Sequence, residues 1–216
     1  AARVLRLPNH AAPVPHAERL RAEARTRLGI AEDALVLAYA GTLAAWQLPE
    51  ASALLVRALR ALRPDARLLM ITPDLDAARA AIGRVGLADA LAVSATPERT
   101  SELLAAADYG LLLRAESLVN RVACPVKFGE YLAVGARPLL TPAVGDQSEL
   151  CASTGLGLVV GLDDAADAAR RVVQDAAAPG TLDAAARAAR RAWADEHITP
   201  QACARRLVEF LGGLRG

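Results

Sequence analysis

Apolar residues fall along this chain in short blocks separated by stretches of helical spacing. Residues 34–40 (ALVLAYA), 67–72 and 109–113 are largely apolar runs, a pattern typical of strands buried on both faces of a parallel sheet. Residues 90–94, 138–141 and 156–160 are shorter runs of the same kind. The spacing predicts helices over residues 17–28, 49–62, 74–84, 97–107, 126–134, 163–176, 181–195 and 200–211.

Regular alternation of strand and helix predicts an α/β fold with a Rossmann-like, doubly wound parallel sheet of about six strands. Ligands of such sheets bind outside the carboxyl ends of the strands. The loops that we expect to carry function are residues 41–47, 72–76, 94–98, 114–127 and 141–149. Residues 1–16, with Pro8, Pro13 and Pro15, are interpreted as a linker from a missing upstream domain, and residues 17–216 as one domain.

Composition narrows the functional classes. The 216 residues are 54% hydrophobic and 23% charged, which excludes a disordered chain. With 25 basic and 24 acidic residues, no basic excess is present to neutralise nucleic-acid phosphates. The longest uncharged run, residues 34–49, is too short and too interrupted for a membrane span, and no signal peptide is visible. The three cysteines lack metal-ligand spacing, so we expect reduced thiols, a cytoplasmic setting and no metal.

The most informative stretch is residues 124–140 (CPVKFGEYLAVGARPLL), which contains Lys127, the only lysine of the chain. Pro125 suits the first turn of a helix, where free backbone N–H groups and the positive end of the helix dipole attract anions. Lys127 adds a full charge there. Glu130 lies about one turn further along, where a carboxylate could accept hydrogen bonds from paired ribose hydroxyls. The competing interpretation is an ordinary helix with a surface Lys and Glu.

This stretch resembles the C-terminal, donor-binding domain of GT-B glycosyltransferases, the group of the retaining family 4 enzymes. Family members carry a Glu, a helix of small residues, then Gly-x-Pro and a strand, which is similar to residues 130–140 here. Weaker likenesses are Leu-Pro-Asn-His at residues 7–10, Tyr-Ala-Gly-Thr-Leu at 39–43, a helix, Ala-Asp and an apolar strand over 101–113, and Gly-Leu-Gly-Leu-Val at 155–159.

The resemblance implies roles for particular positions. Glu130 matches the ribose-binding Glu, the turn at Gly41 faces the donor phosphates, and the loop near Ser94 matches the base-binding edge. The family's first Glu, eight positions before Glu130, is replaced by Val122, so the sugar contact that it makes is either missing here or supplied by Glu116 on the same loop. The residues expected to bind the nucleotide sugar are Gly41, Thr42, Ser94, Arg114, Arg121, Val126, Lys127 and Glu130.

The usual cations of the first-strand turn are also replaced, by Thr42 and by Gln47 and Leu48. A departing diphosphate develops charge that something must offset. Lys127, Arg114 and Arg121 are the available cations, with Lys127 and Arg114 favoured. Lys127 and Glu116 are therefore the candidate catalytic residues. Trp46 has two interpretations, at the mouth of the site or as a packing residue.

Together these features predict the donor-binding domain of a glycosyltransferase that acts on a surface polysaccharide or glycolipid. The donor would be a UDP- or GDP-linked sugar with no further cofactor. We expect this domain alone to bind the nucleotide but to turn over little, and the full enzyme could sit peripherally on the inner membrane through its other domain. The alternatives are a nucleotide-sugar epimerase of GT-B build and a non-catalytic Rossmann-like interaction domain.

Overall fold

The computed structural model describes residues 4–142 and 144–213 and confirms the α/β prediction. Its sheet contains six parallel strands in the order β3-β2-β1-β4-β5-β6. The strands are β1 (Val36–Ala40), β2 (Arg67–Ile71), β3 (Leu91–Val93), β4 (Tyr109–Leu112), β5 (Arg137–Leu140) and β6 (Leu158–Val159). Because the strand order reverses between β1 and β4, the topological switch point lies between these two strands.

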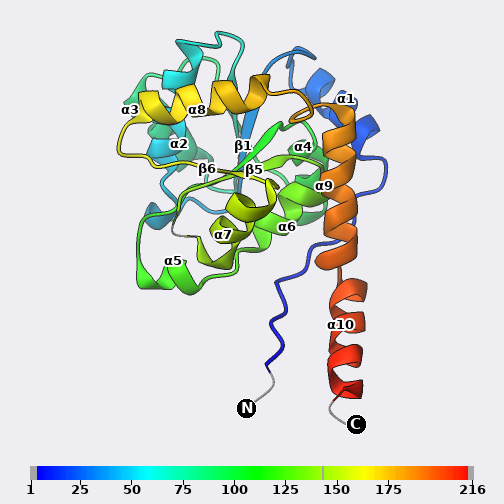
Figure 1. The fold of residues 1–216 in the computed structure, drawn as a ribbon. Coiled ribbons are helices and arrows are strands. Elements are labelled where there is room, and N and C mark those ends of the chain that lie inside the picture. Colours follow the sequence, from blue (N-terminus) through cyan, green and yellow to red (C-terminus); the bar gives the residue numbers. More distant parts are fainter. Residues whose placement is uncertain (1–3, 143, 214–216) are drawn as a thin grey trace.

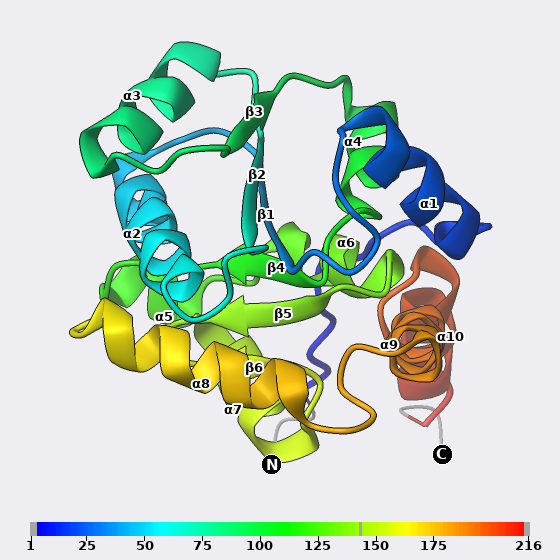
Figure 2. The same ribbon diagram turned by 90° about the horizontal axis from the view of Figure 1, so that it is seen from above.

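Helices cover both faces of the sheet (Figure 2). One face packs against α2 (Pro49–Arg60), α3 (Leu75–Val85) and α8 (Ala165–Ala177). The other packs against α1 (Ala17–Arg27), α4 (Pro97–Leu104), α6 (Val126–Ala133), α7 (Gly145–Thr154) and α9 (Ala184–His197). The two cores draw on alternate residues of the same strands: Leu37 and Tyr39 of β1 face one core, and Val36 and Ala38 face the other.

Several predicted boundaries were wrong by a few residues. The strand expected at 156–160 is only β6 (Leu158–Val159), and the helix expected at 97–107 ends at Leu104. Two helices were missed, α5 (Leu118–Val122) and the full length of α7. The 3-10 turn η1 (Ala45–Gln47) lies in a segment that was expected to be loop.

Helix α6 is placed on the sheet by a glycine in β4. A Cβ at Gly110 would lie 2.1 Å from the Tyr131 ring, so the absence of a side chain there lets the ring lie directly on the strand. The Tyr131 hydroxyl then donates to the carbonyl of Leu111 at 2.9 Å. This contact fixes the first turn of α6 beside the carboxyl ends of β1 and β4.

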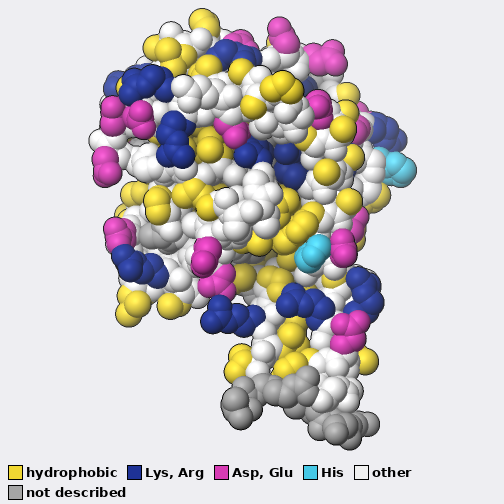
Figure 3. Space-filling model, viewed as in Figure 1, with side chains coloured by type: hydrophobic (Ala, Val, Ile, Leu, Met, Phe, Trp, Pro, Cys, Tyr) yellow, Lys and Arg dark blue, Asp and Glu magenta, His cyan; other side chains and the backbone are white. Residues whose placement is uncertain are grey.

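The N-terminal segment and α10 (Pro200–Gly212) extend together from the body of the domain (Figure 1). Arg206 donates to the carbonyl of Arg6 at 3.0 Å, and Ala11 N–H to the carbonyl of Ile198 at 3.0 Å. Hydrophobic side chains are exposed along this extension (Figure 3), among them Val4, Leu207 and Val208. Residues 4–14 contain no helix or strand, and their assignment as an interdomain linker stays a prediction. In the described part of the chain, no helix is both long and apolar enough to cross a membrane.

Candidate functional site

The switch point between β1 and β4 brings together Lys127, Arg114 and Gly41 from three separate segments. Lys127 lies in the first turn of α6, Arg114 follows β4, and Gly41 follows β1. Gly41 has φ +122°, and a Cβ there would lie 2.7 Å from the Lys127 Cε atom. The Lys127 side chain therefore passes directly against the turn after β1, where the resemblance to GT-B enzymes places the donor phosphates.

Two side chains of the β1 region hold the Lys127 ammonium. Lys127 Nζ donates to the Tyr39 hydroxyl at 2.9 Å and to Gln47 Oε1, and it lies 4.3 Å from the centre of the Tyr39 ring. The Tyr39 hydroxyl donates to Gln47 Oε1 at 2.8 Å, and Gln47 Nε2 donates to the carbonyl of Thr42 at 3.1 Å. Tyr39 and Gln47 are buried, so this network fixes the ammonium position.

Arg114 is held by a different set of contacts. Its backbone N–H donates to the Thr141 hydroxyl at 3.0 Å, and that hydroxyl donates to the Arg114 carbonyl, also at 3.0 Å. These two bonds join the ends of β4 and β5. Its guanidinium donates to Asn120 Oδ1 at 3.1 Å and lies 4.7 Å from the Trp46 ring centre. Arg114 is only 9% exposed, yet its Nε has no hydrogen-bond partner among the described residues. Trp46 packs against this guanidinium and is 46% exposed.

The cations at this site have no carboxylate bound to them within the described residues. Burial, together with the nearby charge of Arg114 and against the effect of Glu130, lowers the pKa of Lys127 to about 8. Burial also raises the pKa of Glu130, against the effect of Lys127. The Glu130 side chain is half-buried and forms no hydrogen bond with the described residues. The site is thus a pair of close cations whose charge an anionic ligand would neutralise.

The other predicted residues lie around this centre or away from it. Thr42 is exposed and contributes its carbonyl to the Lys127 network, and Val126 is 44% exposed at the start of α6. Glu116 and Arg121 form an exposed ion pair beside a neighbouring cavity. Ser94 is exposed in a separate hollow after β3, with Arg27 and Arg99. Ser94 therefore lies in a hollow apart from both the Lys127–Arg114 centre and the cavity lined by Glu116 and Arg121.

Two features of the site were missed from the sequence. Tyr39 carried a weak signal, because a hydroxyl within an otherwise aliphatic strand must find a partner when it is buried. Gln47 carried none, since nothing in the sequence indicates that this loop amide is buried at 6% exposure.

The fold is similar to that of solved glycosyltransferases. WaaG, a glycosyltransferase involved in lipopolysaccharide biosynthesis, has a TM-score of 0.69 and 20% identity over 92% of this chain and 54% of that one. Anabaena HepE, in complex with UDP-glucose, has a TM-score of 0.66 and 18% identity over 90% of this chain and 53% of that one. The C-terminal domain of LpcC, a group 1 family glycosyl transferase from Francisella tularensis, has a TM-score of 0.64 and 13% identity over 88% of this chain and 96% of that one.

This chain thus spans about half the length of WaaG and HepE and nearly the whole of the LpcC domain. It has the fold of the C-terminal domain of GT-B glycosyltransferases. No family model and no curated protein matches its sequence.

Proposed function

We propose that this domain binds a nucleoside-diphosphate sugar and is the donor-binding part of a glycosyltransferase. The observation that carries the proposal is the pair of cations at the switch point, the buried Arg114 and the half-buried Lys127, with no carboxylate bound to either within the described residues. A diphosphate would supply the missing negative charge and a partner for the Arg114 Nε. The charge that develops on a departing diphosphate is neutralised by the same two groups.

Neighbouring residues fit the remaining parts of such a ligand. Glu130 lies close enough to Lys127 for the two charges to interact, and its carboxylate has no hydrogen bond to a described residue, which leaves it available to ribose hydroxyls. The similar structure of HepE was solved with UDP-glucose, which agrees with a nucleotide sugar as the ligand class. WaaG acts in lipopolysaccharide biosynthesis, and we extend the proposal to an acceptor of the surface-polysaccharide or glycolipid kind.

Transfer itself requires the acceptor to be held in line with the anomeric carbon. The chain spans about half the length of WaaG and HepE, and we propose that a second domain supplies that function. The 216-residue domain is then expected to bind nucleotide with little turnover. An epimerase would need a histidine in the cleft, whereas His197 stacks on Trp193 of α9 at 4.5 Å and His10 lies in the N-terminal segment.

A thermal-shift screen of the domain with UDP, GDP, ADP and CMP, each beside its nucleoside, tests the proposal. A ligand at 100 times its dissociation constant stabilises a fold by roughly 2.7 kcal/mol, which is about 5–10 °C for a domain of this size. We expect one diphosphate to give such a shift and its nucleoside to give much less. The absence of a shift with every nucleotide would favour the non-catalytic interaction domain instead.

A further inference from the structure

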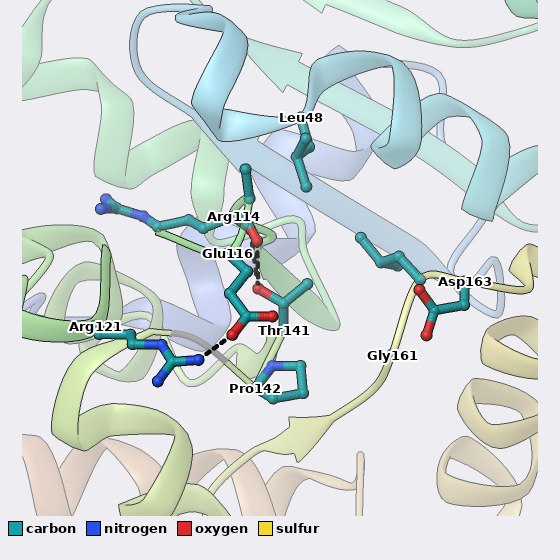
Figure 4. Close-up of a pocket in the computed structure, with 10 residues that line it drawn as sticks. Leu48, Arg114, Glu116, Arg121, Thr141, Pro142, Gly161 and Asp163 are labelled. Carbon is teal, nitrogen blue, oxygen red and sulfur yellow. Dashed lines mark hydrogen bonds and ion pairs between the residues drawn. The ribbon is translucent and has the colours of Figure 1, made fainter. Parts of the chain in front are cut away.

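A cavity of about 470 Å³ lies beside the cation pair, at the carboxyl ends of β4, β5 and β6 (Figure 4). Its volume is within the usual range for small-molecule sites. The walls come from four connecting segments, so the cavity is made by the fold and not by one loop. Its lining includes Leu48, Arg114, Glu116, Arg121, Thr141 and Asp163.

Two carboxylates and the guanidinium of Arg121 line this cavity. Glu116 and Asp163 approach it from opposite sides, and their carboxylates point toward each other across the gap (Figure 4). Arg121 pairs with one oxygen of Glu116, while Asp163 has no hydrogen bond or ion pair with a described residue. The Thr141 hydroxyl is occupied by the backbone of Arg114. Leu48 and Pro142 supply apolar surface.

Arg114 separates the cavity from the proposed diphosphate site. Its backbone lines the cavity, but its guanidinium points away from Thr141 and Asp163 (Figure 4), toward Trp46 and Asn120. A diphosphate bound to that guanidinium therefore lies on one side of residue 114, and a group attached to the diphosphate can enter the cavity on the other side. Carboxylate oxygens accept hydrogen bonds from hydroxyl and ammonium groups and repel another carboxylate.

We propose that this cavity holds the glycosyl group of the donor, and that the unpaired carboxylate of Asp163, across from the Glu116–Arg121 ion pair, selects neutral or amino sugars against uronic acids. The inference rests on the proposed function, because the cavity is assigned through its position next to the diphosphate. It adds a specificity role for the segment after β6, which neither the sequence motifs nor the family resemblance indicated. Asp163 acts on the sugar and has no contact with the nucleotide.

UDP-glucose and UDP-glucuronic acid test this directly, because they differ only at C6, where one carries a hydroxymethyl group and the other a carboxylate. Isothermal titration of the domain with UDP and with both sugars gives three dissociation constants. If guanine is the preferred base in the nucleotide screen, GDP-mannose and GDP-mannuronic acid replace them. We expect the uronate to bind about fivefold or more weakly than the neutral sugar, from like-charge repulsion near a protein surface.

The variant Asp163→Asn removes the one carboxylate of this lining that has no cation paired with it among the described residues, and should bring the two sugar affinities closer by several fold, with the affinity for UDP unchanged. Asp33→Asn is the matched control, since Asp33 is an exposed aspartate that precedes β1, at the amino ends of the strands and away from the cavity. Folding of each variant is checked by its melting temperature.

Equal affinities for the two sugars in the unmodified domain would overturn the inference, and so would an unchanged ratio in Asp163→Asn. In both cases binding of UDP would leave the proposed function standing. If no nucleoside diphosphate binds at all, the proposed function fails and the sugar assignment fails with it.

Discussion

Lys127 is the residue on which the proposed chemistry depends, and its position costs stability. Its ammonium is half-buried, contacts neutral partners and lies near Arg114. The folded-state pKa of about 8 is below the ordinary lysine pKa of 10.5, so the unfolded chain binds this proton more tightly. The charge therefore lowers the free energy of unfolding below pH 8, and that cost is relieved as the pH rises from about 8 toward 10.5.

We predict that Lys127→Met raises the melting temperature of the ligand-free domain at pH 7 by a few degrees. In a domain of this size each kcal/mol of added stability raises the melting temperature by about 2–4 °C. The gain should shrink at pH 9.5, where the native lysine is already neutral. Thermal denaturation at both pH values measures this. Arg79→Met, which alters an exposed cation of α3, is the control and should have little effect at either pH. A destabilised Met variant at pH 7 would contradict the assignment of a buried, unpaired charge.

Gly41 is predicted to matter for binding as well as for stability. Its φ of +122° is a conformation that L residues rarely adopt, and a Cβ would meet the Lys127 Cε at 2.7 Å. Gly41→Ala should cost about 1–3 kcal/mol of stability and displace the ammonium, which weakens binding of the nucleoside diphosphate.

Gly29→Ala provides the comparison for Gly41→Ala. Gly29 has φ +63°, in the left-handed region that also disfavours an L residue, but nothing lies within 4 Å of its Cβ position, so the substitution carries a backbone cost and leaves Lys127 untouched. Denaturation and nucleotide titration of both variants should show two destabilised proteins, of which only Gly41→Ala binds more weakly. Equal affinities in the two variants would remove Gly41 from the site.

At the scale of elements, the strands were predictable because they are continuous apolar runs, and α5 was not because it is short and lacks periodicity. Leu118, Val119 and Val122 of α5 are each at least 75% exposed, so no buried face marks the helix. The sequence also indicated the importance of α6 but not its partner, because Tyr131 reaches Gly110 across 21 positions of the chain. That contact depends on tertiary packing, which local patterns do not encode.

The contact between Tyr131 of α6 and Gly110 of β4 gives a prediction about stability at the scale of elements. Gly110→Ala places a methyl group 2.1 Å from the Tyr131 ring, and neither the strand nor the buried ring can yield easily. We expect a loss of roughly 3 kcal/mol or more in chemical denaturation, at the upper end of the overpacking range. Gly83→Ala, in the exposed interior of α3 with nothing within 4 Å, should be neutral or stabilising by up to about 1 kcal/mol. A mild effect of Gly110→Ala would mean that α6 is not fixed by this contact.

At the scale of the whole molecule, Asp108 links helix α1 to the amino ends of the sheet strands, on the side away from the site. It accepts from Arg25 at 2.9 Å, from Arg21, and from the backbone N–H of Val36 at 2.8 Å, and all three side chains are at most 13% exposed. Breaking such a buried network leaves charges without a partner.

We predict that Asp108→Ala destabilises the domain by about 3–5 kcal/mol, because two buried guanidinium groups lose their counter-charge. Asp65→Ala breaks the more exposed pair between Arg63 and Asp65 and should cost less than about 1 kcal/mol. Urea denaturation of both variants measures the difference. Similar losses would show that the buried network contributes no more than a surface pair.

The central claim, that Lys127 and Arg114 bind the donor diphosphate, is tested most directly by a double-mutant cycle between Lys127 and the β-phosphate. UDP and UMP (or GDP and GMP, according to the nucleotide screen) are titrated calorimetrically at pH 7 into the unmodified domain and into Lys127→Met. We expect the diphosphate preference to fall by roughly 1.5–3 kcal/mol in the variant, the range for a charged hydrogen bond. The same preference in both proteins would show that Lys127 does not contact the β-phosphate, and the account would be contradicted.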